Sequence, residues 1–352
     1  MNPAKKILEN ASADAVFLTS DDASFFYATQ LDGVFEGCFA VVSDKLKIIV
    51  PQLEAETAQA HIKENKVKAE LFVYASRAEI EKYIRESTKK RVLGLNFSKI
   101  SIKTFESIKK FTNAKLVDVG EDINRARGTK EKDEIEKIKK ACEIANKALE
   151  KTLPFVQQGV TESDLAARLD YEIRKQGATN SFATICAFGE NSSQPHYVTG
   201  MRKLKKGDFV LLDFGAKWKN YCSDITRTFV LGKASNEQQK IIECVKEAHE
   251  IGAKNLLEKE IANKSHCDVK DFIDKKYPGK FIHSLGHSIG VEVHDGLTLS
   301  QKSNFLLENN MVFTIEPGIY LPKKGGVRIE DDFVVSGKKP VCISRGQKAF
   351  EL

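Results

Sequence analysis

Residues 209–229 read FVLLDFGAKWKNYCSDITRTF, and the interpretation of the whole chain starts from this stretch. Two apolar runs end on Asp213 and Asp224, and the polar residues 217–220 lie between them. The pattern predicts a strand, a tight turn and a returning strand, which would bring the two aspartates close together. Carboxylates in an apolar setting repel each other and are poorly solvated, so one or two divalent cations are the simplest compensation. The alternative is a pair of ordinary turn aspartates at the surface.

Three later segments favour the metal interpretation. They are FIHSLGHSIGVEVH (residues 281–294), FTIEPGIY (residues 313–320) and GGVRIEDD (residues 325–332). With the two aspartates, His287, Glu316 and Glu330 from these segments make four carboxylates and one imidazole. This ligand set suits a pair of hard-to-borderline divalent ions, which lie roughly 3.5–4 Å apart in two-metal sites. Because the ligands are scattered along the sequence, a sheet has to bring them together.

The order Asp, Asp, His, Glu, Glu resembles that of the pita-bread (creatinase/aminopeptidase-fold) metallopeptidases. The matching segments are DFGAKWKNYCSDITRT, HSLGHSIGVEVHD, TIEPGIY and GGVRIED, and they point to the branch of Xaa-Pro aminopeptidases and prolidases. All five positions are filled in order, which is much more specific than any single motif. The resemblance implies an α/β (α+β) chain with an N-terminal creatinase-like α/β domain over residues 1–122. A pita-bread catalytic domain is expected over residues 123–352.

The resemblance also implies a role for each ligand. Asp213 is expected to hold one metal, Asp224 and Glu330 to bridge the two, and His287 and Glu316 to hold the other. A hydroxide between the metals is then expected to attack the scissile carbonyl, with Glu316 as the general base. Manganese is the expected metal, while cobalt, zinc and iron stay open because ligand type constrains the metal only weakly.

Further pocket residues are expected around the metals. The resemblance assigns His196 and His294 to contact with the substrate and to catalysis. His283 and Tyr320 are additional candidates for the catalytic and substrate-binding groups. For each histidine, the alternative is a hydrogen-bonded residue of the core.

One arginine is expected to orient a ligand carboxylate without contacting the metals itself. Arg328 precedes Glu330 by two positions and therefore shares its face if both lie on a strand. We expect Arg328 to orient a carboxylate, Asp224 by preference. Ile289 and Val291 are candidates for apolar walls of the pocket.

The first 120 residues alternate strand-like and helix-like segments, which predicts an α/β layer domain. The expected strands are residues 15–18, 38–42, 46–50, 71–74, 92–95 and 115–119, and the expected helices are residues 52–64, 79–86 and 102–111. Residues 121–132 are polar and are expected to form a linker. Because no ligand-like cluster occurs before this linker, we expect the domain to limit access to the site rather than to perform chemistry. The family resemblance further implies a homodimer.

The second part of the chain is expected to mix helices with the strands that hold the ligands. Apolar residues recur with helical period in residues 132–149, 165–173, 235–256 and 269–275. Thr161 and Asp164 resemble a capping box ahead of the second of these helices. Residues 189–193 are expected to be a loop that leads to His196. Three other histidines, His61, His249 and His266, lie in charged helical contexts and are expected at the surface.

Composition excludes several classes of protein. The 352 residues have a net charge of +6, but the lysines are spread along the chain rather than gathered in a basic stripe, so nucleic-acid binding is not expected. No apolar run is long enough for a membrane span, and the N-terminus has no apolar signal region. The seven cysteines include no C-x-x-C pair, which indicates reduced, packing cysteines in a cytoplasmic protein.

Several activities are compatible with this reading. The preferred one is a metal-dependent Xaa-Pro aminopeptidase, which removes the residue before a proline at the second position of a peptide. Its alternative is an Xaa-Pro dipeptidase (prolidase), which has to recognise a free carboxylate, usually with an arginine. Residues 295–300, DGLTLS, include no arginine where some prolidases have one, and this favours the aminopeptidase. Methionine aminopeptidase and a non-peptidase creatinase-like protein are the less favoured readings.

Overall fold

The computed structural model describes residues 2–33, 35–89, 92–337, 339–346 and 350–352. The chain forms two compact units, Met1–Arg127 and Gly128–Leu352, and each is described by itself. Sequence analysis places the domain boundary between residues 122 and 123. In the structure, helix α6 (Gly120–Gly128) runs through that position, so the segment expected to be a linker is largely helical. Ile123 and Ala126 are buried on one face of α6, and burial of this apolar face explains why a polar segment is helical here.

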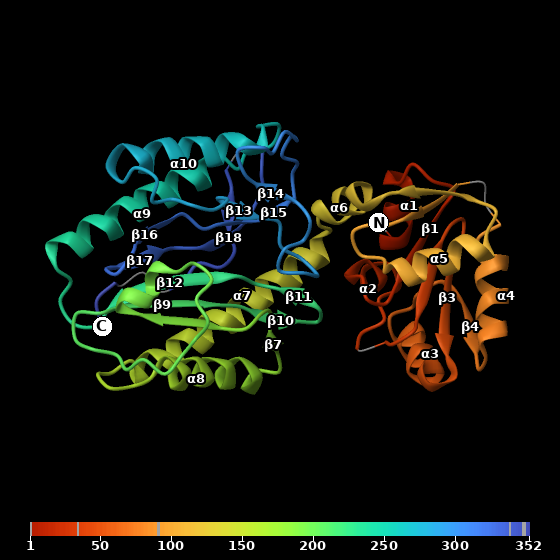
Figure 1. Ribbon diagram of the computed structural model, residues 1–352, viewed down its shortest axis with the longest axis horizontal. Helices are drawn as coiled ribbons and strands as arrows, with labels where there is room; N and C mark the ends of the chain where they lie inside the picture. Colours follow the sequence, from red (N-terminus) through yellow and green to blue (C-terminus); the bar gives the residue numbers. More distant parts are fainter. Residues whose placement is uncertain (1, 34, 90–91, 338, 347–349) are drawn as a thin grey trace. The chain divides into compact units, whose positions relative to one another are not determined.

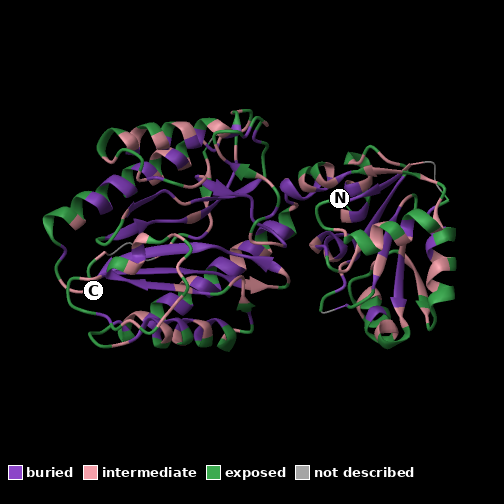
Figure 2. Cartoon of the chain, viewed as in Figure 1, coloured by how far each residue is buried: buried purple, intermediate pink, exposed green. Residues whose placement is uncertain are grey.

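The first unit is built on a mixed six-stranded sheet in the order β4-β3-β2-β1-β5-β6. Its strands are β1 (Ala15–Thr19), β2 (Phe39–Val42), β3 (Leu46–Pro51), β4 (Ala69–Tyr74), β5 (Val92–Leu95) and β6 (Lys115–Asp118). Its helices are α1 (Pro3–Asn10), α2 (Ala23–Thr29), η1 (Gln52–Glu54), α3 (Ala55–Glu64), α4 (Arg77–Ser87) and α5 (Ile102–Phe111). The inner strands β1, β2, β3 and β5 are mostly buried, whereas the edge strands β4 and β6 are partly exposed, as are the outer faces of the helices (Figure 2). The α/β layer that the alternating pattern predicts is therefore present.

Helices α1 and α2 are absent from the prediction. Both begin with a local capping signal: the side chain of Asn2 accepts from the N–H of Ala4, and that of Asp22 accepts from the N–H of Ser24. Such side chains satisfy backbone donors that a helix start leaves free. Each helix has only seven or eight residues, so its apolar periodicity is short.

The second unit combines long helices with several small sheets. Its helices are α7 (Lys132–Thr152), η2 (Leu153–Phe155), α8 (Glu162–Lys175), η3 (Gly189–Ser193), α9 (Asn236–Lys254) and α10 (Ala262–Lys276). Its first strands are β7 (Thr179–Asn180), β8 (Ile185–Phe188), β9 (Phe209–Phe214), β10 (Ala216–Trp218), β11 (Tyr221–Cys222) and β12 (Ile225–Val230). The remaining strands are β13 (Gly286–His287), β14 (Thr298–Leu299), β15 (Val312–Ile315), β16 (Gly318–Leu321), β17 (Gly325–Arg328), β18 (Asp331–Val334) and β19 (Val341–Cys342).

Two hydrophobic clusters divide this unit into halves. In one, helices α7 and α8 pack against strands β8, β9 and β12. In the other, helices α9 and α10 pack against strands β15 to β18. Figure 1 shows α9 and α10 along one side of the unit and α8 along the other, with the strands between them. The candidate ligands come from the strands of both halves.

The hairpin predicted from residues 209–229 is present. Strands β9 and β12 pair antiparallel, with Asp213 opposite Thr226. Lys219 and Asn220 have φ values of 47° and 62° at the tip, as a tight hairpin turn requires. At Gly215 a Cβ would lie 1.9 Å from the carbonyl oxygen of Ser223, so only glycine allows the two arms to approach this closely.

Other predictions of local structure need correction. Helix α10 begins at Ala262, seven residues before the predicted start at residue 269. The early turns were missed because they are polar in sequence, although Ser265 and His266 are buried. His266 is therefore buried rather than at the surface, and His249 is largely buried, with Nε2 3.4 Å from a carboxylate oxygen of Asp331. Residues 189–193 form the 3-10 helix η3 and not an irregular loop.

Two global observations complete the fold. All seven cysteines are free, and five of them are buried, as expected for packing cysteines. In the part of the chain that the structure describes, no helix is both long and apolar enough to cross a membrane.

Candidate metal centre and active site

The five candidate ligands lie in or directly beside strands of the second unit. Asp213 is on β9 and Asp224 immediately precedes β12. His287 ends β13, Glu316 follows β15, and Glu330 lies between β17 and β18. Strands are rigid supports, and ligands held on them keep a defined geometry.

Glycine brings two of these strands unusually close. A Cβ on Gly286 would lie 1.9 Å from the carbonyl oxygen of Thr314, so β13 approaches β15 at a distance that no larger residue permits. The Thr314 hydroxyl accepts from the N–H of His287 at 3.0 Å and lies 3.4 Å from Glu316 Oε1. One threonine therefore contacts both a candidate imidazole ligand and a candidate carboxylate ligand.

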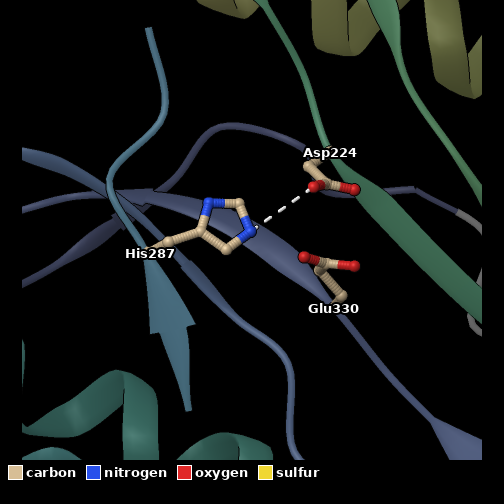
Figure 3. Close-up of side chains that lie close together, drawn as sticks. All are labelled: Asp224, His287 and Glu330. Carbon is tan, nitrogen blue, oxygen red and sulfur yellow. Dashed lines mark ion pairs between the residues drawn. The ribbon is translucent and has the colours of Figure 1, made fainter. Parts of the chain in front are cut away.

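Asp224, His287 and Glu330 form the compact centre of the site. Each offers a ligand atom, and these atoms lie within 4.8 Å of one another (Figure 3). His287 Nε2 is 3.6 Å from Asp224 Oδ2 and 3.5 Å from Glu316 Oε1. The centre thus combines side chains from both halves of the unit.

The His287 ring is oriented for ligation by the atom on its far side. Its Nδ1 lies 3.3 Å from the carbonyl oxygen of Ser288, an acceptor, which assigns the proton to Nδ1. Burial lowers the pKa of His287 to about 4, so the ring is neutral near pH 7. The Nε2 lone pair then faces two carboxylates, an arrangement that only a cation or a proton between them makes favourable.

Three of the candidate ligands have a buried carboxylate oxygen without a hydrogen-bond partner among the described residues: Asp213 Oδ1, Asp224 Oδ1 and Glu330 Oε1. Outside the ligand set, the same is true of one oxygen each of Glu172 and Asp332. Burial, reinforced by repulsion between the acids, raises the pKa of Asp224 and of Glu330 well above the ordinary value. Burial also raises the pKa of Glu316 to about 8, against the opposing influence of Arg328. An unpaired buried charge is costly, so this donor set fits divalent cations rather than a purely structural cluster.

Arg328 supports the site, but on a different carboxylate from the one expected. Its guanidinium donates to Asp213, to the hydroxyl of Thr226 at 3.0 Å and to the hydroxyl of Tyr320 at 2.9 Å. The preference for Asp224 is therefore wrong. The reason lies in the register, because Thr226 pairs with Asp213 across the β9–β12 ladder and both face the same arginine.

Tyr320 and His283 continue this polar chain. The Tyr320 hydroxyl accepts from Arg328 and lies 2.8 Å from His283 Nε2, to which it donates. His283 Nδ1 lies 2.8 Å from the carbonyl oxygen of Ser284. Burial lowers the pKa of His283 to about 4, so its ring is neutral. Both ring nitrogens are thus occupied by neighbours within the chain.

Several residues of the site escaped sequence analysis. The Thr226 hydroxyl donates to Glu330 at 2.6 Å, and Asp332 accepts from the backbone N–H of Asp224 at 3.1 Å. Asp332 also accepts from the thiol of Cys142 at 3.2 Å, and burial raises its pKa to about 7. A signal existed for Thr226 and Thr314, since each lies two positions from an acidic ligand in the sequence.

The centre opens into a cavity of about 790 Å³. His196 and His294 line it, as does His283, and the His294 ring centroid is 4.2 Å from that of His287. Its apolar wall includes Phe182, Ile185, Val198 and Val293. Ile289 and Val291, the expected walls, are buried and are not among the described residues that line the cavity.

Residues 136–337 match the sequence model of metallopeptidase family M24. The chain belongs to family M24. Residues 2–128 match the creatinase/prolidase N-terminal domain, so the first unit and the pita-bread catalytic unit both agree with the fold implied by the sequence. This M24 peptidase is a metal-dependent hydrolase, and the family implies divalent metal ions.

Relatives of this M24 peptidase resemble it over nearly its whole length. It is 35% identical to the Xaa-Pro dipeptidase of Pyrococcus furiosus over 94% of this chain and 93% of that protein. The structure of an Xaa-Pro dipeptidase from Bacillus anthracis aligns with a TM-score of 0.91 at 31% identity, covering 99% of each chain. An X-Pro aminopeptidase from Thermotoga maritima aligns with a TM-score of 0.89 at 30% identity, covering 99% of this chain and 100% of the other.

Proposed function

We propose that this M24 peptidase is a dinuclear-metal Xaa-Pro dipeptidase that hydrolyses the bond before a C-terminal proline. The observation that supports it most is the cluster of buried, unpartnered carboxylates at the base of the cavity, in a chain with full-length Xaa-Pro dipeptidase relatives. This reverses the order of preference drawn from residues 295–300, where the missing arginine favoured the aminopeptidase.

In this proposal the five candidate ligands hold two cations. Asp213 would hold one, Asp224 and Glu330 would bridge, and His287 and Glu316 would hold the other. The oxygens of Asp213, Asp224 and Glu330 that have no hydrogen-bond partner would be available to hold the cations, and Nε2 of His287 would be available as the nitrogen ligand. Manganese is our first choice of metal.

When bound, the cations supply Lewis acidity and make water a nucleophile near neutral pH. The protein residues position the reactants and handle the proton. Glu316 Oε1 lies 3.5 Å from Nε2 of His287, and from this place beside the other ligands its carboxylate can accept and return a proton. His196 and His294 line the cavity and contact the peptide, while His283 orients Tyr320 and through it Arg328.

An Xaa-Pro aminopeptidase is the second candidate, and a specific observation favours it. The single arginine among the described residues that line the cavity is Arg328, and its hydrogen bonds go to Asp213, Thr226 and Tyr320. It is therefore not available to bind the free carboxylate of a dipeptide. If the enzyme is a dipeptidase, the histidines of the cavity or a residue supplied by a partner subunit would have to bind this carboxylate.

A comparison of kcat/KM for Ala-Pro and Ala-Pro-Ala separates the two candidates. The dipeptidase is expected to cleave Ala-Pro and to reject the tripeptide. Equal or better cleavage of Ala-Pro-Ala would establish the aminopeptidase instead. Met-Ala-Ser serves as the control, and its cleavage without that of either proline peptide would establish a methionine aminopeptidase.

Metal dependence is tested by chelation. We expect chelation to abolish cleavage and added manganese to restore it, with about two metal ions per chain by elemental analysis. Full activity in a chain shown to be metal-free would overturn the proposal.

We also propose that the chain works as a homodimer in which the first unit limits access to the site. The access role is based on the described residues of this unit, which contain no cluster of potential metal ligands, and the homodimer on the resemblance to the family. Light scattering that shows a monomer under assay conditions would contradict this.

A further inference from the structure

The segment of residues 189–200 supplies one side of the cavity. It begins with η3 directly after β8, and five consecutive residues, 195–199, line the cavity, among them His196. The side chain of Val198 is 84% exposed at the rim. A segment with exposed side chains at its tip holds a defined position only if something fixes its base.

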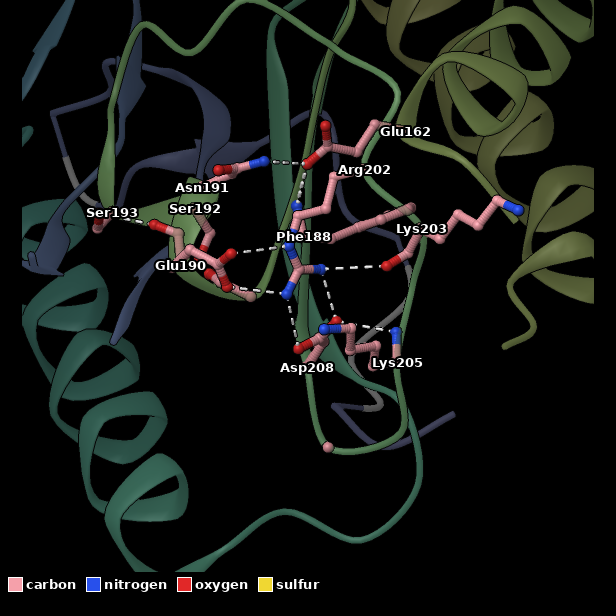
Figure 4. A network of polar contacts seen from close by, with 12 residues as sticks. Glu162, Phe188, Glu190, Asn191, Ser192, Ser193, Arg202, Lys203, Lys205 and Asp208 are labelled. Carbon is pink, nitrogen blue, oxygen red and sulfur yellow. Dashed lines mark hydrogen bonds and ion pairs between the residues drawn. The ribbon is translucent and has the colours of Figure 1, made fainter. Parts of the chain in front are cut away.

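A single buried carboxylate contacts both ends of this segment. Glu162 accepts at Oε1 from the backbone N–H of Phe188 and from the side-chain amide of Asn191, both at 2.8 Å (Figure 4). At Oε2 it accepts from the hydroxyl of Tyr197 at 2.9 Å and from the backbone N–H of Gly200 at 3.3 Å. The Tyr197 hydroxyl in turn accepts from Asn191 at 2.9 Å.

Helix α8, on which Glu162 lies, does not need this carboxylate. Thr161 is the N-cap and accepts from the N–H of Asp164 at 3.1 Å, so the helix start already has its side-chain cap. The four hydrogen bonds of Glu162 all leave the helix and reach the segment or its borders. The Glu162 side chain thus stabilises the wall of the cavity rather than the start of α8.

The charge of Glu162 is stabilised without a cation. Glu162 is 0% exposed, and in the described parts of the chain no lysine or arginine forms an ion pair with it. Its four neutral donors and the N-terminus of α8 stabilise the carboxylate. Burial, together with the hydrogen bond to Glu162, raises the pKa of Tyr197 to about 12, so the phenol remains a donor across the working pH range.

A second contact fixes the outer side of the same segment, but in a more solvated place. Arg202 donates to Glu190 at 2.8 Å and to Asp208 at 2.7 Å (Figure 4). The Glu190 side chain is 55% exposed, and exposed ion pairs are weakened by solvent and salt. Of these two charged contacts, the buried one at Glu162 is therefore the stronger, and the hydroxyls of Ser192 and Thr199 add neutral hydrogen bonds to the same segment.

We propose that Glu162 is a positioning residue: it fixes the segment of residues 189–200 as the wall that presents His196 to the substrate. The inference rests on the proposed function in one respect: the measurement of kcat/KM requires a peptide that the enzyme cleaves. The anchoring itself is a property of the fold and can be measured without a substrate.

The central variant is Glu162→Gln. Its amide keeps one acceptor oxygen but places an NH₂ group against two of the four donors. We expect amide hydrogen exchange of residues 188–200 to become faster, and kcat/KM for the cleaved proline peptide to fall by about 10- to 100-fold. Metal content should stay at the wild-type value, because the five candidate ligands lie on other elements.

Glu172→Gln is the matched control. Glu172 lies on the same helix and is 1% exposed, but its carboxylate pairs with Arg168 of that helix. This variant should lower thermal stability, while exchange in residues 188–200 and kcat/KM stay within a factor of about two of the wild type. Equal effects of the two variants would show that Glu162 is only a structural residue.

Two further variants distinguish the loss of this anchor from misfolding of the Glu162→Gln protein. Tyr197→Phe removes one donor and should produce a smaller change of the same kind. In a His196→Ala background, Glu162→Gln should cost much less than in the wild type, because the two changes act through one wall. Full additivity of the two changes, or unchanged amide hydrogen exchange in residues 188–200, would overturn the proposal.

If the wild type cleaves no proline peptide, the proposed function fails. Amide hydrogen exchange alone then decides whether Glu162 is the anchor.

Discussion

Both units of the chain bury carboxylates within a polar cluster, and these carboxylates differ in their hydrogen-bond partners. In the first unit, Asp22 accepts from the N–H of Ser24 at 2.8 Å and from the side-chain amide of Asn96 at 3.0 Å, and Arg127 lies 3.8 Å away. Both oxygens of Asp22 therefore have partners. In the second unit, Asp213, Asp224 and Glu330 each keep a buried oxygen without one.

The difference separates a structural cluster from a functional one. A satisfied buried carboxylate connects parts of a fold, as Asp22 does by capping α2 and holding Asn96. Unsatisfied carboxylates close to each other are unfavourable to folding, so their retention points to a ligand that offsets the cost. The comparison predicts opposite responses to mutation in the two places.

The largest contrast is expected between Glu316→Ala and Asp22→Asn. Glu316→Ala removes the proposed base and a ligand, so kcat should fall by about 10²–10⁴-fold while the chain stays folded. Asp22→Asn should leave turnover unchanged and lower the free energy of unfolding by about 1–3 kcal/mol. Turnover assays and denaturant unfolding measure the two effects. Turnover of Glu316→Ala within a factor of a few of the wild type would remove Glu316 from the site.

A smaller contrast is expected for two arginines. Arg328→Lys leaves one ammonium in place of a guanidinium that contacts Asp213, Thr226 and Tyr320, so metal affinity or kcat should fall by about 10–100-fold. Arg77→Lys, in the exposed pair with Glu81 on α4, should change neither. Metal titration followed by isothermal calorimetry measures this. A full metal complement and normal turnover in Arg328→Lys would contradict the supporting role of Arg328.

The smallest effect is on the pH dependence of stability. In the metal-free chain the pKa of Glu316 rises from 4.5 to about 8 on folding, so the native state binds more protons and loses stability as the pH rises through this window. The pKa values of His283 and His287 shift the other way on folding, from 6.5 to about 4. The unfolded state therefore binds more protons at these residues, and their contribution to stability rises with pH only up to about pH 6.5. Between pH 6.5 and 8 the buried carboxyl groups, Glu316 among them, therefore dominate the pH dependence.

Over that interval Glu316 alone should cost the metal-free protein on the order of 2 kcal/mol of stability, which lowers Tm by several degrees. The metal-loaded protein should show no such fall, because the cations hold Glu316 ionised. Calorimetry of both forms at pH 6.5 and pH 8 measures the difference. An equal pH dependence in the two forms would mean that Glu316 does not face the metals.

The parts of the fold that depend on local pattern were predictable from the sequence. The hairpin of residues 209–229 and the six strands of the first unit follow from apolar runs and turn residues. The five candidate ligands were proposed from acidic and histidine residues in or beside apolar segments and from the family resemblance, and each lies in or beside a strand. Short helices such as α1, and the polar first turn of α10, were missed because their apolar periodicity is weak.

Residues that act through distant partners were not predictable. Glu162 looks like an ordinary residue of a helix start, and its donors lie 26 to 38 positions further along the chain. Asp332 is one of two adjacent aspartates, and only the fold shows that it accepts from Asp224. The partner of Arg328 depended on the strand register, which a two-residue periodicity does not determine.

Gly286 has a consequence for how such a site can evolve. Because its backbone lies against the carbonyl of Thr314, the spacing between the strands of His287 and Glu316 is already the minimum that a polypeptide allows. Every substitution at position 286 can only push these strands apart. The main chain therefore cannot move inward around a smaller ion here, and any such adjustment has to come from the side chains of His287 and Glu316.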